Sequence, residues 1–288
     1  MVVASACLGA IPVLVGAAIA QEYQPGDKVV VIAKAKLRVE GKGDVDDVWP
    51  GLVFQVRAVD GERLWLSDGH PGWLDRRHVI PLNRAAIDRL TSMVNADPRN
   101  ASLYSGRGNV RKHLGELDAA IADYSEALRF DPKDAHAYHN RGWAWYVKGE
   151  YDKAIADYDE ALRLDPKDAG AYSGRGLAWG AKGEYDKAIA DYDEALRLDP
   201  KHAGVYSRRG LAWLFKGEYD KAIADYSEAL RLDPTYALAY RSRGLAWDAQ
   251  GECDRAIADY SEALLLDPKY VTVYNDRGNA WYAKGEYD

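Results

Sequence analysis

Residues 101–288 repeat one arrangement of apolar and polar positions. The motif Ala-Ile-Ala-Asp-Tyr recurs five times, and a proline follows each copy. The prolines are 34 residues apart, as from Pro98 to Pro132, and the series continues at Pro166, Pro200, Pro234 and Pro268. Counted from Ala101, the full units are 101–134, 135–168, 169–202, 203–236 and 237–270, and a partial sixth covers 271–288. A fixed period of this length predicts a repeat architecture.

Each unit predicts two amphipathic helices, as the second unit shows. A first helix over about 135–148 ends at Gly149, because glycine tolerates the positive φ that closes a helix. We expect Asp152 to cap the next helix by accepting a backbone N–H. That helix ends before Pro166, since a proline disfavours the α conformation in the residue before it. Its apolar residues share one face: Ala154, Ile155, Tyr158, Ala161 and Leu162.

A hairpin this short cannot bury its own apolar face, so stacked copies are expected to form a solenoid. The period resembles that of the tetratricopeptide repeat family, as do the residues Tyr138, Gly142, Trp145, Ala154, Tyr158, Ala161 and Pro166. The resemblance implies a mainly α fold, a right-handed α-solenoid over residues 99–288. Residues 84–97 have the pattern of a second helix without its first, so residues 83–98 are interpreted as a connector helix that caps the array.

The chain departs from the family at one position, where arginine replaces the usual leucine. Arg141 is one example, and it precedes a recurring aspartate, Asp157, by sixteen residues. We expect each such arginine to reach its aspartate and form a ladder of ion pairs. The alternative is separate solvation of both groups, because exposed pairs contribute only about 0–1 kcal/mol. The arginines are Arg107, Arg141, Arg175, Arg209, Arg243 and Arg277.

Five tryptophans also recur at one helical phase, and we interpret them as packing between helices. They are Trp145, Trp179, Trp213, Trp247 and Trp281.

Between Pro25 and Leu82 the pattern changes to short strands. Residues 28–32 and 52–59 are rich in β-branched residues, and Asp60-Gly61 is a hairpin turn signal before Leu64-Trp65-Leu66. Residues 72–81 resemble the closing strands of SH3-like barrels, including bacterial ones. Residues 21–82 are therefore expected to form a small SH3-like β-barrel ahead of the solenoid.

Residues 2–20 carry no charge and end in Ala18-Ile19-Ala20. This pattern suits a signal peptide over residues 1–20, cleaved after Ala20, and predicts an exported protein of the periplasm or cell envelope. No Lys or Arg precedes the apolar stretch, so two alternatives remain. The segment is a retained membrane anchor, or it is neither a signal peptide nor an anchor. Cys7 lies in this segment, which would leave Cys253 as a lone cysteine that cannot form an intramolecular disulfide.

Composition and spacing exclude several functions. A net charge of −7 argues against nucleic-acid binding, which needs a basic face. His136 and His139 share a helix face, but no third ligand converges on them, so we expect no metal and no cofactor. No nucleophile–base pair emerges, and the recurring aspartates sit at a structural phase, whereas an active site is needed once. We therefore expect a protein without enzymatic activity.

The units differ mainly on their first helices, and in the tetratricopeptide repeat family these helices line a concave groove. An apolar strip with aromatic anchors and polar edges suits a bound peptide or protein segment. The alternative is that the leucines only pack between neighbouring first helices. The candidate groove residues are Asn109, Lys112, His136, His139, Trp143, Tyr146, Leu177, Leu211, Leu214, Phe215, Arg241 and Asp248.

The sequence thus predicts a protein–protein interaction scaffold. A rival interpretation makes the SH3-like domain a cell-envelope or cell-wall binding module, with the repeats as a spacer and Tyr23, Trp49, Trp65 and Trp73 as its surface. The last unit stops at Asp288, where the other units begin their second helix, which leaves Trp281 and Tyr282 partly uncovered. We favour truncation there over a docking end that binds, for example, another copy of the chain.

Overall fold

The computed structural model describes residues 23–32, 35–39, 43–48, 50–60, 63–67, 72–75 and 79–285. The chain divides into two compact units, one ending at Leu90 and the other beginning at Thr91. The predicted signal segment, residues 1–20, and Trp49 lie outside the described residues. Among the described helices, none combines the length and the apolar character that a membrane span requires.

The N-terminal unit contains a small antiparallel sheet, which confirms the predicted strands. Seven strands are described, and they pair in the order β3-β2-β6-β5-β4-β1-β7. Apolar residues of β1, β3, β4, β5, β6 and β7 form its core, and β5 places Leu64 and Leu66 in that core. Asp60 pairs with Arg63 where the hairpin turn was expected. The strands are β1 (Lys28–Val31), β2 (Ala35–Val39), β3 (Gly43–Val48), β4 (Val53–Asp60), β5 (Arg63–Ser67), β6 (Gly72–Asp75) and β7 (Val79–Pro81).

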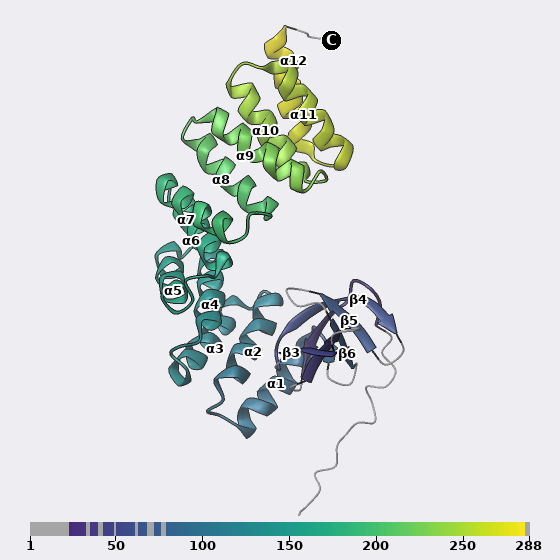
Figure 1. The fold of residues 1–288 in the computed structure, drawn as a ribbon, viewed down its shortest axis with the longest axis vertical. Coiled ribbons are helices and arrows are strands. Elements are labelled where there is room, and N and C mark those ends of the chain that lie inside the picture. The colour runs from purple at the N-terminus through teal and green to yellow at the C-terminus, as the bar shows by residue number, and fades with distance from the viewer. Residues whose placement is uncertain are drawn as a thin grey trace, which may run out of the picture. The chain divides into compact units, whose positions relative to one another are not determined.

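Helices account for nearly all of the rest, at the predicted places (Figure 1). Helix α1 (Arg84–Ala96) precedes the hairpins, as expected of the connector. The first helices of the repeats are α2 (Ala101–His113), α4 (Ala135–Val147), α6 (Ala169–Ala181), α8 (Ala203–Phe215), α10 (Ala237–Ala249) and α12 (Val271–Lys284). The second helices are α3 (Leu117–Phe130), α5 (Tyr151–Leu164), α7 (Tyr185–Leu198), α9 (Tyr219–Leu232) and α11 (Cys253–Leu266).

The turn inside each hairpin explains one wrong prediction. Gly149 has a φ of 79° and closes α4, as expected. The next helix, however, begins at Tyr151 with Glu150 at the N-cap position, and no side chain caps it. Asp152 is therefore already inside the first turn of α5, where its carboxylate pairs with Lys182 of the next hairpin. The side-chain caps lie on first helices instead, where Asp134 and Asp168 accept backbone N–H groups at 3.0 Å and 2.9 Å.

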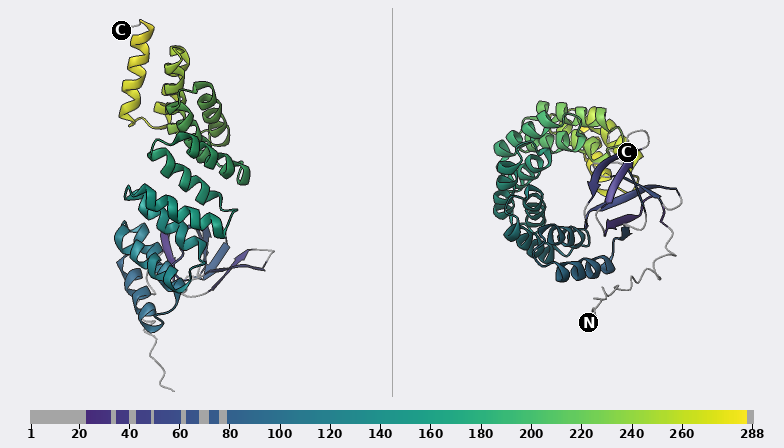
Figure 2. Two further views of the ribbon diagram at one scale, coloured as in Figure 1. Left: turned by 90° about the vertical axis from the view of Figure 1, so that its left-hand side faces the viewer. Right: turned by 60° about the horizontal axis from the view of Figure 1, so that its bottom comes forward.

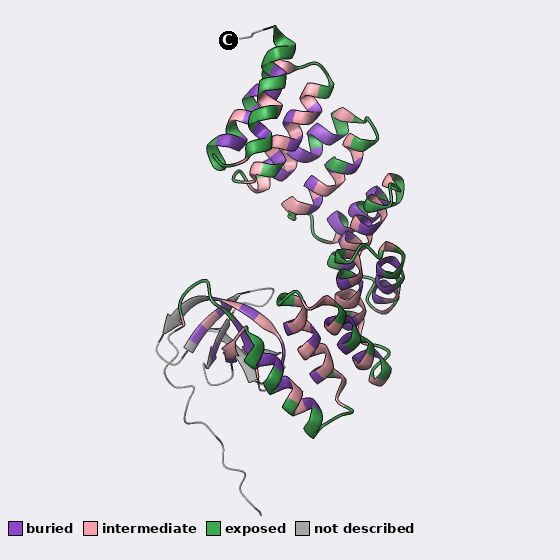
Figure 3. Cartoon of the chain, turned by 180° about the vertical axis from the view of Figure 1, so that it is seen from behind, coloured by how far each residue is buried: buried purple, intermediate pink, exposed green. Residues whose placement is uncertain are grey.

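The core of the array lies between consecutive hairpins. The predicted face of α5, from Ala154 to Leu162, is buried together with Ala171 and Ala178 of α6. Buried and exposed residues alternate along the helices in Figure 3 as this packing requires. Trp145 and Trp179 pack against this core, as expected, but remain half-buried. Lys153 lies 4.5 Å from the Trp145 ring centroid, so a cation covers the outer face of this tryptophan.

Stacking continues through the unit that begins at Thr91, and its helices follow one another around a coil (Figure 2). First helices of consecutive hairpins approach one another more closely than second helices do. The first helices therefore line the inner, concave side of the array.

Candidate functional site on the first helices

An arginine ladder holds the hairpins in place beside the concave face. Arg141 donates from Nε and Nη2 to the two carboxylate oxygens of Asp157, at 2.8 Å and 2.7 Å. The same bidentate pairing joins Arg107 to Asp123, Arg175 to Asp191, Arg209 to Asp225 and Arg243 to Asp259. The predicted ladder is confirmed at these five positions, and the aspartates are buried.

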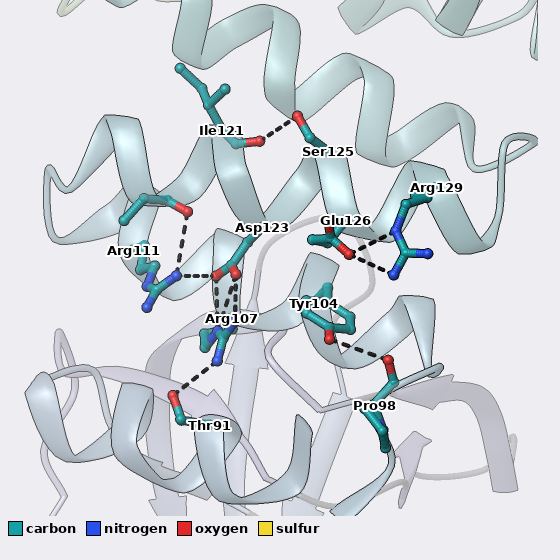
Figure 4. Close-up of polar contacts among 11 residues, drawn as sticks. Thr91, Pro98, Tyr104, Arg107, Arg111, Ile121, Asp123, Ser125, Glu126 and Arg129 are labelled. Atoms are coloured by element: carbon teal, nitrogen blue, oxygen red, sulfur yellow. Dashed lines mark hydrogen bonds and ion pairs between the residues drawn. The ribbon is translucent and has the colours of Figure 1, made fainter. Parts of the chain in front are cut away.

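Each of these arginines also contacts the preceding helix pair, which the sequence analysis missed. Arg107 Nη1 donates to Thr91 Oγ1 at 3.2 Å (Figure 4), and Arg141 Nη1 donates to Ser125 Oγ at 3.1 Å. The sequence held a signal for this contact, because the partner in each case lies sixteen residues before the arginine. One guanidinium thus joins three helices, and the framework beneath the concave face is fixed at every step.

The concave face itself is built from contacts between consecutive first helices and the loops that precede them. These contacts are Ser105 to Asp134 at 3.2 Å, Lys112 to Asn140 at 2.7 Å, His139 to Asp168 at 2.8 Å, Arg208 to Ser173 at 2.8 Å and Arg241 to Asp276 at 2.7 Å. Each joins one hairpin to the next. Polar contacts thus join the hairpin of α2 to that of α4, α4 to α6, α6 to α8, and α10 to α12.

The apolar groove candidates differ in exposure. Trp143 and Leu211 keep 38% and 43% of their surface exposed, so both are available to a partner. Tyr146 and Leu214 are half-buried and pack against core clusters, and Leu177 is also half-buried. Phe215 is 62% exposed but stacks on Tyr185 with ring centroids 5.3 Å apart, at the end of α8 near the start of α7.

The N-terminal part of the face is basic and aromatic. Lys112 donates to Asn140 Oδ1 and lies 5.5 Å from the Trp143 ring centroid. Burial lowers the pKa of Lys112 to about 8, because desolvation disfavours its charged form. Asn109 accepts a hydrogen bond from the Tyr124 hydroxyl at 2.8 Å, which occupies its carbonyl oxygen.

The two histidines are not brought together as a metal site. His136 is exposed, whereas His139 Nδ1 is hydrogen-bonded to Asp168. They line an open hollow with Asn140 and the loop before α6. Among the described residues, no group of three or more His, Cys, Asp or Glu side chains is placed to hold a metal ion.

Small residues of α6 form the centre of the face. A Cβ at Gly174 would lie 2.5 Å from Tyr158 Cζ and 2.6 Å from its Oη, so this glycine is required by the tyrosine. Arg208 reaches across to Ser173 from α8. Burial raises the pKa values of Tyr158 and Tyr192, and the nearby positive charge of Arg208 opposes that rise.

The C-terminal part of the face is acidic. Arg241 pairs with Asp276, so the charge of this candidate residue is already neutralised. Asp248 has no hydrogen bond or ion pair from its carboxylate within the described part of the chain. Burial, and then the charge of Asp276, raise the pKa of Asp248 above its ordinary value.

Comparison with known proteins decides the family. A family model described as tetratricopeptide repeat matches residues 83–135, 107–169 and 139–203, and one described as TPR repeat matches 216–247 and 249–285. The chain belongs to the tetratricopeptide repeat family. Proteins of this repeat fold are typically interaction scaffolds without enzymatic activity. No curated protein matches the chain.

Solved tetratricopeptide structures share the fold of the array. MamA is 30% identical, with a TM-score of 0.53 over 57% of this chain and 96% of its own. YrrB, whose structure is described as a TPR protein with an unusual peptide-binding site, is 21% identical, with a TM-score of 0.55 over 65% of this chain and 96% of its own. PilF of Pseudomonas aeruginosa is 19% identical, with a TM-score of 0.59 over 68% of this chain and 89% of its own.

The family matches begin at residue 83, so they concern the repeats and leave the sheet unassigned. In that sheet, Tyr23 packs against the core and Trp65 is half-buried. The side chain of Trp73 lies outside the described residues, as does the whole of Trp49. The SH3-like resemblance and the surface expected of these aromatic residues therefore stay predictions.

Proposed function

We propose that this tetratricopeptide array is a non-enzymatic scaffold that binds a peptide or protein segment along its first helices. The observation that carries the proposal is the exposure of Trp143 and Leu211 on that face, among polar side chains of the first helices. Exposed apolar side chains rimmed by polar ones are typical of interaction sites. The peptide-binding site reported for YrrB supports the same use of the fold.

A cross-linking pull-down with the intact chain and two variants tests this proposal. The groove variant carries Trp143→Ala, Leu211→Ala and Phe215→Ala, which remove exposed apolar surface and leave the half-buried Tyr146 and Leu214 in place. The control carries Leu265→Ala, which removes a 73% exposed leucine from a second helix. Circular dichroism first establishes that all of them are folded.

The expected result is a specific protein that the intact chain and the Leu265→Ala control retain and the groove variant loses. Binding of that purified protein is then measured directly by titration calorimetry with the same three chains. Retention by all three chains would reject the concave face as the binding surface and direct attention to residues 21–82.

A second proposal concerns location. We propose that the chain is exported, on the strength of the uncharged stretch 2–20 and its Ala18-Ile19-Ala20 end. N-terminal sequencing of the protein recovered from its host tests this. A mature chain that begins at Gln21 is the expected result, and an intact Met1 in the soluble fraction would contradict it.

A further inference from the structure

Two opposite charges on neighbouring first helices have no charged partner among the described residues. Arg208 of α8 makes one hydrogen bond, to Ser173 Oγ at 2.8 Å, and within the described residues no carboxylate pairs with it. An arginine side chain has five N–H donors, so most of its capacity is free. By contrast, the adjacent Arg209 is fully occupied by Asp225 and Asp193.

The surroundings of Arg208 favour an anionic group. The side chain is half-buried above the small residues of α6, where water screens a charge less than at an open surface. The Tyr158 and Tyr192 rings are buried, and their hydroxyl groups lie near the guanidinium. A half-buried guanidinium with free N–H donors can bind a carboxylate with charge-assisted hydrogen bonds.

The surroundings of Asp248 favour a cationic group. Its carboxylate is half-buried and lies near Asp276, whose charge Arg241 already neutralises. The cluster of these three side chains keeps one negative charge. Beneath it the hydroxyl of Tyr260 is buried with no hydrogen-bond partner. An ammonium or guanidinium group placed against Asp248 would offset the cost of burying that carboxylate.

Apolar side chains separate the two charges. Arg208 is the sixth residue of α8 and Asp248 the twelfth of α10, a difference of six residues along the helix direction. That offset corresponds to roughly 9 Å, and neighbouring helix axes lie about 10 Å apart, so the two positions on the helices are about 13 Å apart. Arg208 reaches toward α6 and Asp248 lies near Asp276 of α12, so the two charges are farther apart than their helix positions. Leu211 and the half-buried Leu245 belong to the same stretch of the face.

We propose that the segment bound by the array carries an acidic side chain that pairs with Arg208 and a basic side chain that pairs with Asp248. An extended chain needs more than about four residues to cover this distance, with an apolar residue between the two charges to contact Leu211. The two charges fix the register and direction of the segment, while the apolar contacts supply most of the affinity. This inference rests on the proposed function, because it names the chemistry of the partner.

Selection from a library of random peptides displayed on phage tests the inference. The intact chain is expected to enrich peptides with one acidic and one basic residue at a fixed spacing of more than about four positions. Arg208→Glu is expected to enrich peptides in which a second basic residue replaces the acidic one. Asp248→Lys is expected to enrich peptides in which a second acidic residue replaces the basic one.

Matched controls change the same net charge elsewhere. Arg197→Glu alters an exposed arginine of α7 that pairs only with Glu194, and Glu262→Lys alters an exposed residue of α11. Both are expected to enrich the same peptides as the intact chain. In fluorescence anisotropy, a synthetic peptide from the first selection is expected to bind Arg208→Glu about tenfold more weakly, and a peptide with the matching charge reversal to recover the loss.

The selection distinguishes failure of this inference from failure of the proposed function. Enriched peptides that lack the charge pair, or that stay the same on Arg208→Glu and Asp248→Lys, would overturn the inference and leave the groove as a binding site. Absence of any peptide that binds the intact chain better than the Trp143→Ala, Leu211→Ala, Phe215→Ala variant would overturn the proposed function and the inference with it.

Discussion

Arg175 holds Asp191 of its own hairpin through two hydrogen bonds, of 2.9 Å and 2.6 Å, and Asp159 of the preceding hairpin through a third, of 2.6 Å. Asp191 is buried, whereas the Asp159 side chain is 55% exposed. One guanidinium therefore balances a charge that water cannot reach and fastens two repeats to each other. The hydrogen bonds from Arg175 also raise its own pKa, so the cation persists at any working pH.

Replacing this arginine alone is expected to be costly. Arg175→Leu leaves Asp191 buried without a counter-charge and should lower the free energy of unfolding by about 3–5 kcal/mol. The double variant Arg175→Leu, Asp191→Leu removes both charges and should recover most of that loss, because an apolar pair of similar volume can replace a buried ion pair. Urea unfolding followed by circular dichroism measures both.

The control for this experiment is Arg197→Leu. Arg197 and Glu194 form an exposed pair, which should contribute no more than about 1 kcal/mol. Equal losses for Arg175→Leu and Arg197→Leu would show that the ladder is not what holds the repeats together.

Two glycines of α6 are expected to respond oppositely to alanine. A Cβ at Gly174 would lie 2.5 Å from Tyr158 Cζ, so Gly174→Ala should destabilise the array by about 1–3 kcal/mol through overpacking. A Cβ at Gly180 would meet nothing closer than Ala188 Cβ at 3.9 Å, so Gly180→Ala should stabilise by up to about 1 kcal/mol through helix propensity. Thermal and urea unfolding of the two variants show whether each substitution lowers or raises the stability.

Tyr158→Leu removes the ring that Gly174 accommodates. In that background Gly174→Ala should lose most of its penalty, and an unchanged penalty would mean that the clash is not its cause.

The sequence could predict the repeated framework because it appears five times at a fixed spacing. Period, helix faces and the sixteen-residue step from Arg141 to Asp157 are all local relations within one unit. The error at Asp152 has a local cause as well, since a helix that begins at Tyr151 moves this residue inside the first turn. A cap depends on the φ and ψ of one residue, and residue type alone did not settle it.

The concave face was harder to predict because its contacts join different units. Arg208 was not among the candidates, although it is the one position of its kind that carries a cation; the equivalent residues are Gly106, Asn140, Gly174, Ser242 and Asp276. In the described part of the chain its hydrogen bond goes to Ser173, and no carboxylate pairs with it. Arg241 was a candidate, but its pairing with Asp276 takes up its charge. Whether a charge is paired therefore depends on contacts between stacked hairpins, which the sequence of one unit does not contain.

The corrected cap assignment makes a prediction of its own. Asp168→Ala removes the cap on α6 and the partner of His139, and should destabilise by about 1–2 kcal/mol at pH 7. Asp152→Ala removes only a pairing of its exposed carboxylate with Lys182 and should cost less than about 1 kcal/mol. Similar losses in urea unfolding would restore Asp152 as a structural cap.

The same variant has a defined pH dependence. Burial tends to raise the pKa of Asp168, but the hydrogen bonds from His139 and from the backbone of Ala171 and Gly170 outweigh it, and the pKa is lowered. An acid with a lowered pKa stabilises the fold above its ordinary pKa, about 3.9, and that contribution is lost as the pH falls through the folded value. The stability difference between the intact chain and Asp168→Ala should therefore shrink below about pH 4.

Lys112 should give a pH dependence of the same sign at alkaline pH, because its pKa is also lowered. Burial lowers its pKa from 10.5 to about 8, so the unfolded chain binds more protons than the folded chain between these values. The free energy of unfolding of the intact chain, measured against Lys112→Met, should therefore be flat below pH 8 and rise by about 2–3 kcal/mol between pH 8 and 10.5. Urea unfolding of both chains across this range measures the difference, in which the titration of other groups cancels. A difference that does not change with pH would show that Lys112 keeps its charge, and with it an ordinary hydrated environment beside Trp143.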